Sequence, residues 1–121
     1  MGEWDLLGGN PAPGSVGSVD SAVRAFARVA DYASDAKSSL LRAGSELGAG
    51  SWTGKAAEAF RSNLSVLPGE LNTVAVSHRE ASRALARFRD SLDEAQRRAR
   101  ELMTRALQTA DEIARDDAAA E

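Results

Sequence analysis

Apolar residues recur along the first half of the chain at steps of three, four and seven, the spacing of a helix that packs against another helix. Between residues 19 and 47 they are Val19, Val23, Phe26, Ala30, Ala33, Leu40 and Leu47. Ser18 is a candidate N-cap, and Asp20 would lie in the first turn, where the helix dipole favours an acid. Glycines at 44, 48 and 50 can supply C-cap conformations. This pattern predicts a helix over about 18–47.

A second and more regular apolar stripe fills the other half of the chain. Its members are Ala57, Phe60, Leu64, Leu67, Leu71, Val74, His78, Ala81, Leu85, Phe88, Leu92, Ala95, Ala99, Leu102, Ala106 and Ile113. Pro68 interrupts the helical hydrogen bonding, yet the stripe passes it without changing phase. We therefore predict a helix over about 55–116 that is kinked or briefly broken near Pro68.

A short turn over residues 48–54, which ends in Trp52-Thr53-Gly54, separates these two helices. Because such a short connection makes neighbouring helices antiparallel, the predicted fold class is all-α, an antiparallel helical hairpin. Residues 1–17 are rich in Gly and Pro and are expected to form an irregular arm, followed by the hairpin over 18–121. Trp4, Leu6 and Leu7 would either anchor this arm on a helix or await a partner.

The two predicted helices differ in length, which leaves part of the second one uncovered. At about 1.5 Å per residue the first helix spans roughly 45 Å and the second roughly 90 Å. The first helix therefore covers the second only to about residue 86. An uncovered apolar stripe indicates a binding surface. We predict helix docking at Phe60 beside the turn and along the uncovered stripe at Leu85, Phe88, Leu92 and Leu102.

Composition narrows the possible functions without naming one. The net charge of −3 gives no strong attraction to nucleic acid. The chain has no cysteine, so it has neither a disulfide framework nor a thiolate metal site. No apolar run approaches the roughly 20 residues that span a bilayer.

Catalytic and metal-binding residues are not indicated, and no cofactor is expected. His78 is the only histidine, and a general base or a metal ligand needs companions, so a partly buried or interface histidine is the better interpretation. The arginines between 79 and 105 suggest a nucleic-acid face, but the pairs Asp93–Arg97, Glu94–Arg98 and Glu101–Arg105 fit a solvated helix. We predict that the protein is not an enzyme.

The turn and the residues after it resemble the WXG100 (ESAT-6-like) superfamily of type VII secretion. Trp52-Thr53-Gly54 is followed by Ala56, Ala57 and Phe60, as in that superfamily. The stretches Leu67–Leu71 and Leu92–Arg98, with Gly-Asn-Pro at 9–11, are similar to the N-terminal targeting domains of actinobacterial secreted toxins.

This resemblance implies a hairpin that pairs with a second hairpin, self or WXG100-like, as a four-helix bundle. It also implies contact with type VII secretion machinery, synthesis in the bacterial cytoplasm, secretion by a type VII-like route and a toxin domain following in the full-length chain. The superfamily's Tyr-x-x-x-Asp/Glu signal is not matched, because Ala36 follows Tyr32 at the fourth position. The chain is thus predicted to be a non-catalytic targeting or adaptor domain. Two alternatives remain: a structural coiled-coil oligomerisation domain without a secretion role, and a nucleic-acid-binding helix.

Overall fold

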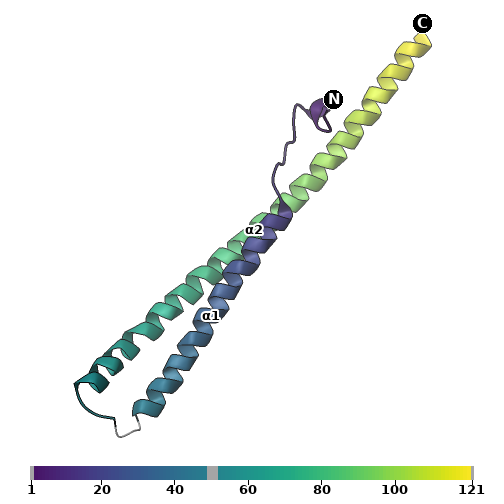
Figure 1. Ribbon diagram of the computed structural model, residues 1–121. Helices are drawn as coiled ribbons and strands as arrows, with labels where there is room; N and C mark the ends of the chain where they lie inside the picture. Colours follow the sequence, from purple (N-terminus) through teal and green to yellow (C-terminus); the bar gives the residue numbers. More distant parts are fainter. Residues whose placement is uncertain (1, 49–51, 121) are drawn as a thin grey trace. The chain divides into compact units, whose positions relative to one another are not determined.

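The computed structural model describes residues 2–48 and 52–120 of the chain, which contain two long helices (Figure 1). A short 3₁₀ helix, η1, covers Asp5–Leu7, α1 covers Val16–Gly48, and α2 covers Lys55–Ala120. The all-α fold class and the two predicted helices are confirmed. Residues 49–51 of the predicted turn lie outside the described residues.

The chain divides into two compact units that we describe separately. The hairpin unit comprises residues 20–86, and the arm unit comprises residues 1–19 together with 87–121. Each unit contains one part of α2 and the segment that packs against that part.

Contacts between α1 and α2 in the hairpin unit run in opposite directions along the two helices. From the start of α1 onward, Val23 contacts Ser82, Asp31 contacts Arg79 and Lys37 contacts Asn72. As the number rises in α1, the number of its partner in α2 falls. The antiparallel hairpin predicted from the short turn is therefore present in this unit.

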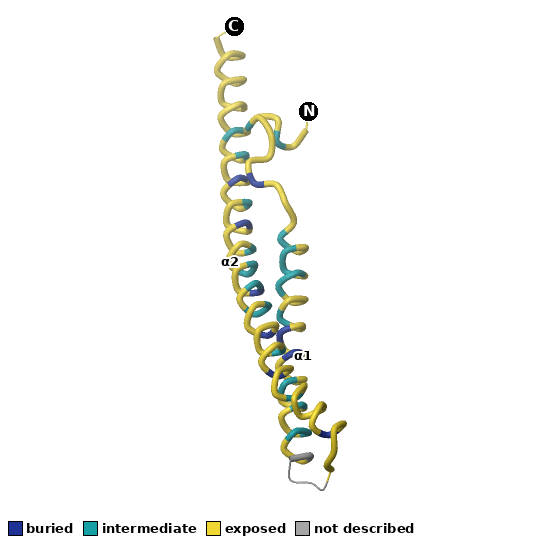
Figure 2. The backbone as a smooth tube through the Cα atoms, turned by 90° about the vertical axis from the view of Figure 1, so that its left-hand side faces the viewer, coloured by how far each residue is buried: buried dark blue, intermediate teal, exposed yellow. Residues whose placement is uncertain are grey.

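Small side chains line the contact between α1 and α2. Ala30 and Ala57 are fully buried, and Ala33, Ala75 and Ser82 are each less than a tenth exposed. Figure 2 shows the buried positions along the sides of the two helices that face each other. Small residues allow helix axes to approach closely, and no large side chain of the described residues is fully buried.

Pro68 lies inside α2, and the helix continues through it. Of the two predicted alternatives, a kink or a brief break, the break is not present. The Pro68 ring is buried, and its burial offsets part of the cost of the missing backbone hydrogen bond.

The two helix starts differ in how well the sequence predicted them. α2 begins at Lys55 as predicted, directly after Gly54, whose φ is 106° and whose carbonyl oxygen accepts a hydrogen bond from Glu58 N–H. The prediction that Ser18 caps α1 is wrong. Ser15 is the cap, because its Oγ accepts a hydrogen bond of 3.1 Å from the Ser18 backbone N–H.

The N-terminal arm packs along α2 in the arm unit. The Gln96 side-chain amide donates hydrogen bonds to the carbonyl oxygens of Ala12 and Gly14, at 3.2 and 2.8 Å. Farther toward the N-terminus, Leu6 lines a cleft together with Met103 and Leu107. The arm is thus anchored on α2 through the carbonyls of Ala12 and Gly14, whereas Leu6 remains 44% exposed.

Candidate docking surface

Two columns of α2 flank the central positions 57, 64, 71, 78, 85, 92, 99 and 106 that repeat every seven residues. Residues three positions after each central residue form one column, which we call the apolar flank: Phe60, Leu67, Val74, Ala81, Phe88, Ala95, Leu102 and the final Thr109. Residues four positions after form the other column, which begins at Arg61 and which we call, from its members at the contact with α1, the small-residue edge: Arg61, Pro68, Ala75, Ser82, Arg89, Gln96, Met103 and Ala110. The sequence pattern assigned the apolar flank to the packing seam.

In the hairpin unit, however, α2 packs on α1 through the small-residue edge. Ala75 and Ser82 are buried, whereas Phe60, Leu67 and Val74 on the apolar flank are 39%, 40% and 36% exposed. Since large side chains keep helix axes apart, the close approach of α1 selects the edge with the smaller residues. The more hydrophobic column therefore remains in contact with solvent.

Exposed apolar residues of α1 extend this surface. In two antiparallel helices that face each other, equal offsets from the central positions lie on the same side of both helices. Taking Phe26 and Ala33 as the central positions of α1, Val29 has the same offset as Val74 on α2, and it is also exposed. Tyr32 beside it is largely exposed as well. The open side of the hairpin unit is thus an apolar surface two helices wide.

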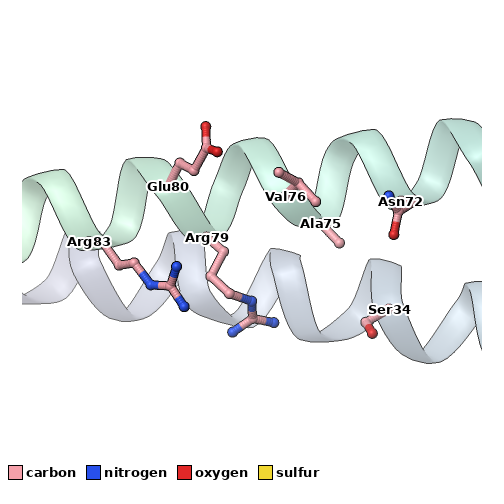
Figure 3. Close-up of a pocket in the computed structure, with 7 residues that line it drawn as sticks. All are labelled: Ser34, Asn72, Ala75, Val76, Arg79, Glu80 and Arg83. Atoms are coloured by element: carbon pink, nitrogen blue, oxygen red, sulfur yellow. The ribbon is translucent and has the colours of Figure 1, made fainter.

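The opposite side of the hairpin unit is polar and internally bonded. Arg79 Nη2 lies 2.9 Å from Asp31 Oδ1, and Lys37 Nζ donates a 3.1 Å hydrogen bond to Asn72 Oδ1. Figure 3 shows a hollow on this side, where Arg79 extends from α2 toward α1. Charged groups are thus concentrated on the side away from the apolar flank.

The turn residues form a small aromatic contact at the start of α2. The ring centroids of Trp52 and Phe60 are 5.6 Å apart, and Arg61 Nη2 donates a 2.6 Å hydrogen bond to the Trp52 carbonyl oxygen. Both rings remain partly exposed. The structure therefore joins the predicted turn motif and the predicted docking residue Phe60 at one end of the apolar flank.

The other predicted docking residues differ in accessibility. In the arm unit, Phe88 and Leu102 are 56% and 51% exposed, whereas Leu92 is buried. A Cβ placed on Gly14 would lie 3.4 Å from Leu92 Cδ2, so the arm itself covers Leu92. Leu85, in the hairpin unit, is half-buried. Periodicity missed this distinction because it says nothing about where an irregular arm lies.

The chain matches the model of a protein family described as "Putative T7SS secretion signal domain", and the match covers residues 12–120. The chain belongs to this T7SS signal domain family. Comparisons with curated proteins and with solved structures gave no match. The predicted resemblance to a type VII secretion targeting domain is confirmed by the family match, and the family points to secretion by a type VII route.

His78 of this T7SS signal domain is partly buried, as predicted. Its ring centroid lies 5.5 Å from that of Phe26, and its Nδ1 is 2.8 Å from the Val74 carbonyl oxygen. Among residues 2–48 and 52–120, no group of three or more His, Asp or Glu side chains is arranged to hold a metal ion.

Two of the three ion pairs that the spacing of charges predicted are present along α2, and the third, Glu101–Arg105, is not among the ion pairs of the described residues. Asp93–Arg97 and Glu94–Arg98 form ion pairs at 3.7 and 2.7 Å. These pairs fit a solvated helix face. No helix in the described part of the chain is long and apolar enough to cross a membrane.

Proposed function

We propose that this T7SS signal domain is a non-catalytic targeting domain that docks its apolar flank against a partner helical hairpin. The two hairpins would form a four-helix bundle, which is delivered to the type VII secretion machinery. The observation that carries this proposal is the exposure of Phe60, Leu67 and Val74 in a helix that packs on α1 through a different edge.

The partner is a helix pair because of the shape and spacing of this surface. Apolar residues repeat every seven positions on α2, which a second helix matches by inserting its own side chains between them. Val29 on α1 widens the surface to two helices, which a two-helix partner covers. Fully burying a Leu or Phe side chain contributes about 1.5–3 kcal/mol, so the residual exposure of several such residues is enough for specific docking.

The polar side is a poorer candidate for the same role. Docking there would separate Arg79 from Asp31 or bury both charges, and a buried ion pair loses the solvation of its charges. The apolar flank carries no such cost, because its residues are uncharged.

The experiment compares Val74→Ser with Val76→Ser in the native host. Both valines are exposed, 36% and 47%, but Val74 lies on the apolar flank and Val76 lines the hollow on the polar side. We expect Val74→Ser, alone and with Leu67→Ser, to lower capture of a co-purifying hairpin-sized chain about tenfold per residue and to lower export. Val76→Ser should change neither.

Two outcomes would contradict the proposal. If Leu67→Ser with Val74→Ser leaves partner capture unchanged, docking does not use the apolar flank. If these substitutions abolish association while export persists, the apolar flank serves oligomerisation and export does not depend on it. Light scattering on the purified chain distinguishes a second copy of this chain from a different partner.

A further inference from the structure

In the arm unit, the N-terminal arm lies against α2 at the central position Leu92 and at Gln96 on the small-residue edge. Leu92 and the next central residue, Ala99, are 9% and 2% exposed, and Gln96 between them is half-buried. This part of α2 is therefore buried although α1 does not reach it in the arm unit.

The arm is held in register at residues 10–14. Asn10 Oδ1 accepts a 2.9 Å hydrogen bond from Ala12 N–H and so folds the chain over Pro11. The single Gln96 amide then donates to the carbonyl oxygens of Ala12 and Gly14 on either side of Pro13. Prolines 11 and 13 have no N–H to satisfy, so carbonyl acceptors dominate this segment and one donor side chain suffices.

Side-chain packing supports the same register. Ala12 is only 8% exposed, and Gly14 has a φ of 129°, which an L-residue rarely adopts. A Cβ on Gly14 would also be in van der Waals contact with Leu92, 3.4 Å from its Cδ2. Toward the N-terminus, Leu6 faces Met103, Leu107 and Ala110 across an open cleft. Residues 10–14 of the arm are therefore held by hydrogen bonds. Residues 3–6 lie beside the apolar side chains of Met103, Leu107 and Ala110 on α2.

We propose that residues 3–14 are a built-in cover that excludes partner helices from the Leu92–Met103 edge and directs docking to Phe88 and Leu102. The exclusion of partners stands on the arm contacts alone, whereas the directing effect rests on the proposed function. A helix that keeps its apolar flank exposed and has the neighbouring residues covered offers a partner a single orientation, which is a common means of specificity.

The test releases the arm in a chain that also carries Phe88→Ser and Leu102→Ser. These two substitutions make the exposed apolar flank of the arm unit polar, so that it no longer contributes to association. Gln96→Ala removes the one side chain that donates to both arm carbonyls, and Gly14→Val adds strain at a positive φ. The matched control replaces Gln96→Ala by Gln108→Ala, at an exposed glutamine of α2, and keeps Gly14. Trp52→Phe in every variant leaves Trp4, in the arm, as the single tryptophan.

On release, we expect Trp4 emission to shift to longer wavelength and the mass from light scattering to rise above that of the control. Adding Met103→Gln, which makes the uncovered edge polar, should reverse the rise in mass. Unchanged Trp4 emission would show that Gln96 and Gly14 do not hold the arm. A shifted emission with unchanged mass would show that the edge needs no cover. Either result would contradict the proposal that the arm is a cover. The proposed function is tested separately, by Leu67→Ser and Val74→Ser in the hairpin unit.

Discussion

The Ser82 hydroxyl on α2 donates a hydrogen bond to the Val23 carbonyl oxygen on α1, at 2.8 Å. Ser82 is one of the least exposed residues of the hairpin unit, at 7%. A polar side chain in such a position needs a partner, and the carbonyl of a facing helix supplies it only when the axes lie close. This bond therefore places Ser82, on the small-residue edge, against α1, and the apolar flank lies outside this contact.

Ser82→Ala should reduce the free energy of unfolding by about 1 kcal/mol, because it removes one neutral hydrogen bond while keeping the small volume. Ser82→Leu should cost about 1–3 kcal/mol through overpacking, although it makes the contact more hydrophobic. Urea unfolding measures both changes. The control is Ser77→Ala, whose hydroxyl bonds to Val74 in its own helix. If Ser82→Leu were stabilising, the close contact between α1 and α2 would be wrong.

Gly54 and Gly69 should respond in opposite directions to replacement by alanine. A Cβ at either position meets no atom within 4 Å, so only backbone conformation decides. Gly54 has a φ of 106° and Gly54→Ala should cost about 1–3 kcal/mol. Gly69 is helical, and Gly69→Ala should stabilise by about 0.5–1 kcal/mol. The two midpoints in thermal unfolding should therefore move apart, and shifts of the same sign would contradict the conformation at Gly54.

Pro68→Ala should stabilise the chain. A proline in a helix interior costs about 3 kcal/mol, and alanine restores the backbone N–H at position 68. The gain should be smaller than this figure, because the substitution also removes a buried ring. Urea unfolding should show a higher midpoint, while Val66→Ala at a nearby exposed position should change it little. A lower midpoint would mean that the packing of the Pro68 ring outweighs the lost hydrogen bond.

Helix positions in this protein follow from periodicity, but the packing edge does not. The seven-residue repeat identifies the central positions of α2, and the phase across Pro68 correctly indicates one long helix. The same repeat assigns Leu67 and Val74 to the seam because they are hydrophobic, whereas the structure buries Ala75 and Ser82. Two helices that approach closely need small side chains at their contact as well as hydrophobic ones. A hydrophobic pattern shows which residues are hydrophobic but not which are small enough for that contact.

Local polar bonds explain the remaining differences. Ser15 and Ser18 are both suitable caps, and the sequence alone does not show that the Ser15 hydroxyl reaches the Ser18 N–H. The cover over Leu92 depends on a glutamine amide that bonds to an irregular arm. An uncharged polar residue beside the buried positions Leu92 and Ala99, such as Gln96, is the one signal that would have suggested a bonded partner there.

Trp52→Ala should separate recognition from stability at the turn. Trp52 is 41% exposed, and its described ring contact is with Phe60. An aromatic pair contributes about 0.5–1.5 kcal/mol beyond its buried area, so the hairpin should stay folded when the indole is removed. Helix content by circular dichroism should be unchanged and the unfolding midpoint slightly lower, whereas export from the native host should fall because the exposed aromatic surface at the end of the apolar flank is lost. Trp52→Phe, which keeps a ring against Phe60, should retain more export than Trp52→Ala at similar stability. Full export of Trp52→Ala would show that the turn is not part of the surface that the secretion route recognises.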